Sequence, residues 1–317
     1  MKLLLWLLLL GWIGPCRAQP QSFSALDAHA RTVSAGTDPN LTELVAKLVT
    51  PAKTDLEKAR VLFVWTATHI HYDTGLMKPY TYGLPRLIDT VAAATRIVQA
   101  RRGVCSDYAL VLYVLLRKAG LPARVVMGYA KGHPDLAGAP VRSINHVWNL
   151  VQIDGQWHPL DATWASTDNG TRPLNTHYFL TPAHEFAADH LPDNPNPQTL
   201  PKPLTRGEFD ALPRVYSPYF GLGFGPDFPK QGLFRVQKRL QLSVSISREM
   251  EFEVLANRYA QPANTRTFYL RAFRTKKGYD LVMQVFRDGL YSVHILARPK
   301  GETTEFQPIL TLTVIKE

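Results

Sequence analysis

A run of apolar and aromatic residues, unbroken from 108 to 116, is the strongest hydrophobic feature in the middle of the chain. A helix that is apolar on every side lies buried at the centre of a domain. The run ends as helices end, with Arg117 and Lys118 in the last turn and Gly120 just beyond it. The pattern therefore predicts a buried central helix whose first turn contains Cys105.

Elements of two different periodicities flank this helix. Before it, apolar residues recur at helical spacing, so residues 19–75 are predicted to be mainly helical. A surface loop is expected over 75–90 and a further helix over 90–100. After the central helix the spacing favours strands, which we expect over 123–130, 145–153 and 156–163.

A two-residue turn connects the last two of these strands. Its sequence, Asp-Gly at 154–155, is a strong signal for a tight hairpin. If the strands pair directly across the turn, Trp148 lies opposite Asp161, and Asp161 is the diagonal, same-face neighbour of His146. Diagonal neighbours lie about 7–8 Å apart between backbones, which these two side chains can bridge. The hairpin therefore predicts a contact between His146 and Asp161.

The C-terminal third changes character. Short alternating runs separated by turn signals fill residues 234–317, a spacing typical of an immunoglobulin-like β-sandwich. Between the two regions, residues 177–230 are rich in Pro, Gly and aromatic residues, and we expect one short helix near 183–190 followed by an extended connector. The fold class is therefore α+β, with a mixed core followed by an all-β domain.

The first residues have the pattern of a secretory leader. Lys2 precedes an apolar run over 3–13, and small residues at Cys16 and Ala18 form a cleavage site. The run is too short to span a bilayer. We therefore expect cleavage after Ala18, export to a periplasm or out of the cell, and no transmembrane segment in the mature chain.

Charge narrows the range of partners. The chain has 36 Lys and Arg against 26 Asp and Glu, and two of the basic residues lie in the predicted leader, so the mature chain has a net charge of +8. A basic balance favours anionic surfaces. Because no long Lys/Arg run concentrates the charge, we expect contact with cell-envelope polymers or membranes rather than nucleic acid.

Cys105 is the only cysteine of the mature chain, and it lies where a nucleophile would be useful. Backbone N–H groups and the helix dipole at a helix start favour the thiolate and can hold an oxyanion. A lone cysteine is more often a small buried apolar residue, His146 alone a structural histidine and Asp161 alone a capping carboxylate. Together, nucleophile, base and orienting acceptor predict a Cys-His-Asp triad.

Metal chemistry is not expected from the histidines. His69 and His71 stand two residues apart, without a second close His pair or Cys to complete a site. His184-Glu185 begins a zinc-protease motif, but Ala188 stands where its second histidine belongs. We therefore predict no metal and no cofactor.

The same residues carry a resemblance to a known family. The segments G-V-C-S-D-Y-A, N-H-V-W-N and W-H-P-L-D-A-T-W resemble the core of the transglutaminase-like superfamily. H-Y-F-L-T-P-A-H-E-F, H-L-P-D-N-P and T-R-G-E-F-D-A-L-P are similar to its kyphoscoliosis-peptidase branch, so the resemblance covers roughly residues 22–225. It implies a papain-like fold in which Cys105, His146 and Asp161 are the catalytic residues. One departure, Pro159, lacks an N–H and indicates an edge or bulge.

The resemblance implies acyl transfer on peptide or amide bonds through a thioester on Cys105. We expect hydrolysis of a protein or peptide substrate, with two alternatives: a cross-linking transglutaminase, and a non-catalytic binding module of the same fold. A second oxyanion donor would be Tyr72, Trp65 or Trp148, among which spacing does not choose. The predicted parts are a signal peptide at 1–18, a catalytic domain at 19–200, a connector at 201–233 and the sandwich at 234–317.

Overall fold

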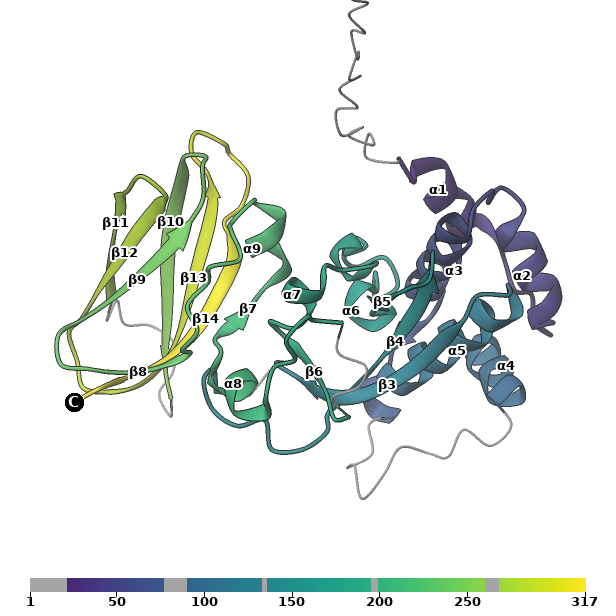
Figure 1. Cartoon of the computed structure of the whole chain (residues 1–317), viewed down its shortest axis with the longest axis horizontal. Coiled ribbons are helices and arrows are strands. Elements are labelled where there is room, and N and C mark those ends of the chain that lie inside the picture. Colours follow the sequence, from purple (N-terminus) through teal and green to yellow (C-terminus); the bar gives the residue numbers. More distant parts are fainter. Residues whose placement is uncertain (1–21, 77–89, 133–135, 195–198, 260–267) are drawn as a thin grey trace, which may run out of the picture.

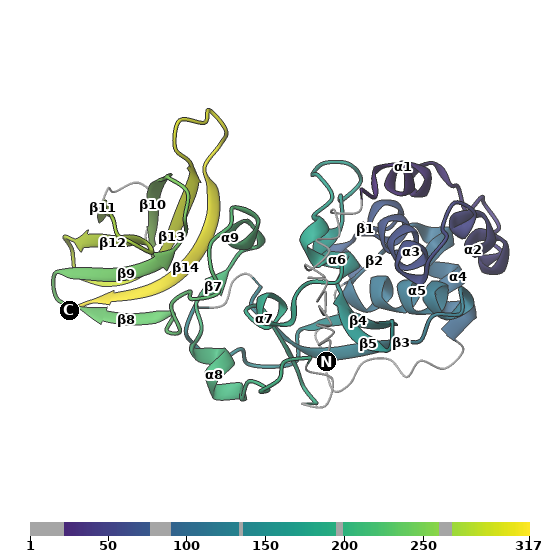
Figure 2. The same ribbon diagram turned by 45° about the horizontal axis from the view of Figure 1, so that its top comes forward.

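The structure is a computed structural model in which the chain forms two lobes (Figures 1 and 2). The predicted leader and most of the predicted loop at 75–90 lie outside the residues it describes. Among the described residues, none of the helices has the length and the apolar surface that spanning a membrane requires. The described residues are 22–76, 90–132, 136–194, 199–259 and 268–317.

Helices pack around a central one in the first lobe. That helix is α5 (Cys105–Lys118), and Tyr113 is the only residue of its apolar run that is not buried. α5 contacts four other helices and three strands, which confirms the predicted buried central helix. The surrounding helices are α1 (Ser24–Thr32), α2 (Leu41–Val49), α3 (Asp55–His69) and α4 (Thr90–Ala100).

A four-stranded antiparallel sheet lies against α5, in the order β5-β4-β3-β6. The Asp-Gly hairpin forms as predicted, with Ile153 paired to Gln156 and the register running on to Asn149 opposite Leu160. Pro159 lies on the edge strand, where its missing N–H leaves no ladder partner unpaired. The strands are β3 (Ala123–Ala130), β4 (His146–Ile153), β5 (Gln156–Leu160) and β6 (His190–Pro192).

The predicted strand does not continue to residue 163. After Leu160 the chain turns into the short helix α6 (Ala162–Ala165), and Asp161 is its N-cap. The pairing of Trp148 with Asp161 is therefore not formed. The physical reason is the Asp161 carboxylate, which accepts the first N–H groups of α6 in place of a strand partner.

The C-terminal region is all β, as predicted. One sheet has the order β10-β13-β14-β7, with β8 also on β14, and a second has the order β11-β12-β9. The strands are β7 (Arg214–Val215), β8 (Leu233–Val236), β9 (Arg239–Ser245), β10 (Met250–Arg258), β11 (Phe268–Arg274), β12 (Gly278–Val285), β13 (Gly289–Pro299) and β14 (Gln307–Lys316).

The prediction of an extended connector after residue 190 is wrong. This stretch contains β6 and β7 as well as two helices, and β7 joins the C-terminal sheet beside β14. The Pro and Gly residues of this stretch separate short helices and strands instead of keeping the chain extended. Its aromatic residues therefore reach the core, where Phe209 and Tyr219 are fully buried. The remaining elements are β1 (His71–Tyr72), β2 (Arg102–Gly103), η1 (Thr74–Leu76), η2 (Thr176–Tyr178), α7 (Ala183–Phe186), α8 (Arg206–Ala211) and α9 (Ser217–Gly221).

The described residues form two large hydrophobic cores and a small cluster around Cys105, and the second large core crosses the boundary between the lobes. The first core lies between the helices and the four-stranded sheet. The second fills the sandwich but also contains Val141, Ala188 and Leu191 from the first lobe. At Gly138 (φ +77°) the loop between β3 and β4 approaches the backbone of Leu233 so closely that an added Cβ would lie 2.2 Å from its nitrogen. The two lobes are therefore packed directly on each other.

Candidate active site

Cys105 is the first residue of α5, so the first turn of a buried helix holds the thiol. The residue is 3% exposed and packs against Ala109 and Val147. The Asn149 side chain donates to the Ala109 carbonyl at 2.9 Å, which fixes this end of α5 on β4. The helix therefore presents Cys105 to the strand that begins with His146.

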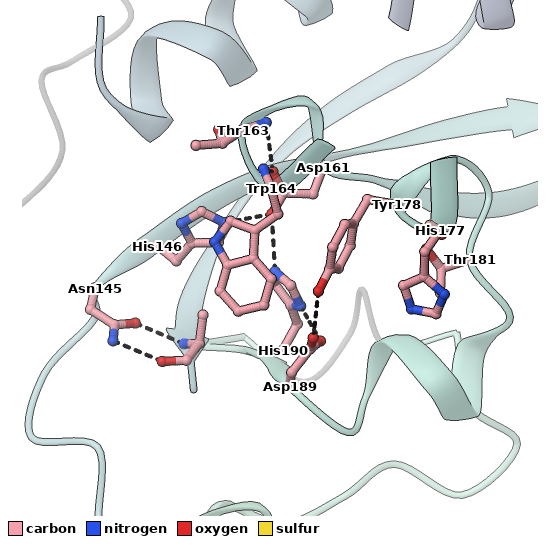
Figure 3. A network of polar contacts seen from close by, with 11 residues as sticks. Asn145, His146, Asp161, Thr163, Trp164, His177, Tyr178, Thr181, Asp189 and His190 are labelled. Carbon is pink, nitrogen blue, oxygen red and sulfur yellow. Dashed lines mark hydrogen bonds and ion pairs between the residues drawn. The ribbon is translucent and has the colours of Figure 1, made fainter. Parts of the chain in front are cut away.

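His146 contacts both of the other predicted site residues. Its Nε2 lies 2.6 Å from Oδ2 of Asp161 (Figure 3). Its ring also forms a hydrogen bond with Cys105, for which Nδ1 is the remaining nitrogen. Immediately before it, Asn145 accepts from the Ala130 N–H at 2.7 Å and donates to the Ala130 carbonyl at 2.9 Å. This two-bond clamp, which sequence analysis did not single out, fixes the start of β4 against β3.

Asp161 uses both carboxylate oxygens. Oδ1 accepts the N–H groups of Thr163 and Trp164, at 2.8 and 3.0 Å. Oδ2 receives His146 and, at 3.1 Å, Nε2 of His190. Burial alone would raise the pKa of this carboxyl, but the two imidazoles outweigh burial and hold its pKa far below the usual range. Asp161 is therefore ionised, and both of its oxygens accept hydrogen bonds.

The charges favour an ion pair at the nucleophile. Burial alone would lower the pKa of His146, but the Asp161 charge, its hydrogen bond and the contact with Cys105 raise it to about 10. At neutral pH His146 is then an imidazolium beside the thiol. An imidazolium next to a cysteine, together with the positive end of a helix, stabilises the thiolate.

Among the three candidate oxyanion donors, the structure favours Tyr72. Trp65 donates its indole N–H to the Val33 carbonyl at 2.9 Å, so that group is engaged elsewhere. Trp148 stacks beside His146 and is 1% exposed. Tyr72 lies on β1, paired with β2 just before α5, and burial, followed by the charge of Cys105, raises its pKa to about 12. The phenol therefore stays protonated and able to donate near the thiol.

His190 belongs to this network, and sequence analysis missed it. Its side chain is fully buried, and its Nδ1 lies 2.5 Å from Oδ1 of Asp189, whose Oδ2 accepts the Tyr178 hydroxyl at 3.0 Å (Figure 3). In the sequence, His190 stands at the end of the short helix expected near 183–190 and in the motif H-L-P-D-N-P, which is similar to the kyphoscoliosis-peptidase branch. The three residues of β6 are too few for a periodic pattern, so only that similarity gave any signal.

The ligand atoms of His146, Asp161 and His190 lie within 4.8 Å of one another. In a tetrahedral zinc site, ligand atoms about 2.1 Å from the metal are roughly 3.4 Å apart. The 2.6 Å between His146 and Asp161 is shorter and is the distance of a hydrogen bond. The arrangement therefore fits a hydrogen-bonded network rather than a metal site.

His69 is one of the two histidines considered as metal ligands in the sequence analysis. Its ring forms a hydrogen bond with the Trp65 carbonyl and stacks on the Trp65 indole.

Comparison with known proteins identifies the family. Residues 42–162 match the sequence model of the transglutaminase-like superfamily. Human kyphoscoliosis peptidase is 32% identical over 223 residues, 68% of this chain and 32% of that protein, and the mouse protein of the same name is 32% identical over 221 residues. Cytokinesis protein 3 of Schizosaccharomyces pombe is 27% identical over 209 residues, 64% of this chain and 23% of that protein.

The chain spans about a third or less of the length of these curated relatives. The matched family region includes Cys105, His146 and Asp161, which the structure brings together around one imidazole. It also includes the central helix and the β3–β5 part of the sheet. The chain therefore belongs to the transglutaminase-like superfamily, on its kyphoscoliosis-peptidase-like branch.

Proposed function

We propose that the chain is a cysteine-dependent acyl-transfer enzyme that hydrolyses peptide or amide bonds through a thioester on Cys105. The observation that carries the proposal is the position of His146, hydrogen-bonded to Cys105 on one side and to Asp161 at 2.6 Å on the other. A nucleophile, a base and an orienting acceptor joined in this order are the parts that covalent acyl transfer needs.

In the first half-reaction, the Cys105 thiolate bonds to the acyl carbon of the substrate. The carbonyl oxygen becomes an oxyanion, which the first turn of α5 and the Tyr72 hydroxyl stabilise. His146 gives its proton to the amine nitrogen, the C–N bond breaks, and the amine leaves. The products are a thioester and a neutral imidazole, and Asp161 keeps the imidazole in the orientation it needs next.

In the second half-reaction, water attacks the thioester and passes a proton to His146. The C–S bond then breaks, the acid leaves, and the thiolate and imidazolium are restored. An amine in place of water would give a cross-linked product by the same steps. We favour water because it needs no binding site of its own. The name of the human and mouse relatives, kyphoscoliosis peptidase, also supports hydrolysis.

The setting of the reaction is part of the proposal. The leader pattern at 1–18 supports export, and the net charge of +8 expected after its removal supports a protein or peptide substrate held near anionic polymers of the cell envelope. Mass spectrometry of the protein from its native source tests export. A mature chain that starts near Gln19 is expected, and cytosolic protein with an intact leader would contradict it.

The function itself is tested with a labelled peptide library, with and without a primary amine, using wild type and Cys105→Ala. We expect shortened or deamidated peptides from wild type and none from the variant. Asp154→Asn, at the hairpin turn away from the site, is the control for a mere loss of an acid and should remain active. Amine incorporation in preference to hydrolysis would assign cross-linking instead. A partner recovered equally by wild type and Cys105→Ala, with no product or thioester formed, would assign a binding module.

A further inference from the structure

We propose that His190 is a positioning residue that remains an imidazolium and shares the Asp161 carboxylate with His146. The inference deepens the proposed function, because it concerns how the base of Cys105 is held and charged. His190 does not touch the reacting atoms. It acts through Asp161, whose Oδ2 lies 3.1 Å from Nε2 of His190 and 2.6 Å from Nε2 of His146.

The hydrogen-bond count requires the second proton on His190. A neutral imidazole has one N–H and one lone pair. Both ring nitrogens of His190 face carboxylates, Asp161 at 3.1 Å and Asp189 at 2.5 Å. An ionised carboxylate only accepts, so two ionised partners are satisfied only if both nitrogens donate. The Tyr178 hydroxyl on the far oxygen of Asp189 supports ionised Asp189, because a hydroxyl donates well to a carboxylate.

The surroundings of the ring also suit a cation. His190 is 1% exposed, so its charge has no solvent and depends on protein groups. Phe186 stacks on it with ring centroids 4.1 Å apart and planes at 14°, and Trp164 lies 4.4 Å away. An aromatic face within about 6 Å attracts a cation. Burial alone would lower the pKa of His190, but Asp189 and Asp161 raise it above the ordinary value.

The sheet brings the two histidines to one carboxylate. On β3, Gly128 pairs with His146 of β4, and Ala130 pairs with His190 of β6. Positions 128 and 130 share a face because side chains alternate along a strand, so both imidazoles lie on the same face. The ring centroids of His146 and His190 are 5.3 Å apart. Asp161, at the start of α6, occupies the place between them (Figure 3).

Sharing the Asp161 carboxylate with His190 changes how readily His146 releases its proton. A lone carboxylate would make His146 strongly basic and slow to release its proton to the leaving amine. A second cation on the same oxygen offsets part of that negative charge and keeps Asp161 ionised. It also adds a positive charge near the Cys105 thiolate. The titratable groups that face His190 are Asp161, Asp189, His146, Tyr178 and His177.

The first experiment measures the protons on His190 directly. Protein with ¹⁵N-labelled histidine is followed by NMR from pH 5 to 9, with His190→Gln used to assign the His190 signals. We expect both His190 nitrogens to stay protonated through neutral pH. In Asp189→Asn, which keeps the shape and removes one partner charge, His190 should lose its proton at a lower pH than in wild type. A neutral His190 in wild type, or an unchanged titration in Asp189→Asn, would overturn the proposal.

The second experiment measures what the charge does to Cys105. The rate of alkylation by iodoacetamide is recorded against pH for wild type, His190→Gln and a matched control, His177→Gln. The control removes a neighbouring, partly buried imidazole that stacks on Phe220 and, in the described structure, forms no hydrogen bond with Asp161 or Asp189. We expect the acid-side midpoint to move up by about 0.5–1 pH unit in His190→Gln and to stay in place in the control. Superposed profiles would overturn the proposal, since a merely structural role lowers yield or stability without moving a midpoint.

The two readouts separate this inference from the proposed function. Reactive, triad-dependent Cys105 with a neutral His190 would remove the inference and leave the acyl-transfer proposal intact. An ordinary, unreactive Cys105 thiol with a doubly protonated His190 would remove the proposed function, while the charge state of His190 would stand. If His190→Gln does not fold, Asp189→Asn carries the test through the NMR titration, where an unchanged midpoint counts against the proposal.

Discussion

Asp161 combines two tasks that its two oxygens keep apart. One oxygen caps α6 through two backbone N–H groups, and the other receives two imidazoles. A carboxylate with four partners cannot rotate without breaking several hydrogen bonds. At the scale of single residues, the site is therefore rigid because its central acceptor is also a structural cap.

Asp161→Asn separates these tasks. The amide oxygen still caps α6, but the charge is lost and an N–H₂ group faces the imidazoles, so His146 is held in the wrong tautomer. We expect hydrolysis to fall by about 10³–10⁴-fold, with unchanged far-UV circular dichroism. Asp154→Asn is the matched control. Near-full activity of Asp161→Asn would show that Asp161 does not orient the base.

Tyr72→Phe tests the second oxyanion donor. The substitution removes only the hydroxyl that the raised pKa keeps protonated. We expect turnover to fall about 10²-fold, while iodoacetamide alkylation of Cys105, which forms no oxyanion, stays at the wild-type rate. Equal loss in both reactions would instead assign Tyr72 to the shaping of the thiol environment.

The raised and lowered pKa values set the pH dependence of stability. His146, with a folded pKa of about 10, contributes stability that is complete below its unfolded value of about 6.5 and is lost as the pH rises toward 10. His190 acts in the same direction. Asp161 contributes above about pH 4 and loses its contribution in acid. We expect Tm to decline from pH 6.5 to 10, and less steeply in His146→Gln; parallel declines in the two proteins would contradict this.

At the scale of elements, β3 determines where the two histidines lie. It is the only strand that pairs with both β4 and β6 in the four-stranded sheet. Opposite the two histidines, β3 has the small residues Gly128 and Ala130, and the Trp148 ring lies close to Gly128. A Cβ at Gly128 would lie 2.1 Å from the Leu191 carbonyl and 2.7 Å from the Trp148 ring.

Gly128→Ala is therefore expected to push β6 and Trp148 away from β3. Overpacking of this kind costs about 1–3 kcal/mol, and here it also moves both imidazoles. We expect a lower Tm and slower alkylation of Cys105. The matched control is Gly132→Ala, whose added Cβ meets nothing within 4 Å. Equal behaviour of the two variants would mean that β3 does not control the site.

The sequence predicted the elements whose signals are local. The central helix, the Asp-Gly hairpin and its register follow from spacing and turn chemistry within a few residues. His146 and Asp161 could therefore be paired in advance. β6 could not be predicted, because three residues have no period and its partner β3 lies some sixty positions earlier. For that reason the sequence does not reveal His190. It predicts Asp161 as a strand residue because the role of Asp161 as an N-cap depends on the turn that follows it.

At the scale of the whole molecule, the lobes share a core. Val141, Ala188 and Leu191 of the first lobe pack in the core that also fills the sandwich. β7, which precedes the sandwich in the chain, pairs with β14 of the sandwich. The described residues therefore form one packed body with two large hydrophobic cores, and not two domains joined by an open linker.

Calorimetry tests this coupling. Leu48→Ala makes a cavity in the first core and Leu281→Ala in the sandwich, at two fully buried positions. Each is expected to cost about 2–5 kcal/mol. If the lobes unfold together, both substitutions lower the Tm of one shared transition. Two separate transitions, each moved by only one substitution, would show that the lobes unfold independently.

The position of β6 has a consequence for inheritance. His190 and Leu191 are consecutive residues on opposite faces of this strand, so the charged network and the sandwich core lie one peptide bond apart. A recombination event that replaced the sandwich with that of a distant relative would change the packing around Leu191 and, with it, the place of His190. The two lobes are therefore expected to be inherited together, and substitutions around Leu191 to be accompanied by compensating substitutions in the sandwich.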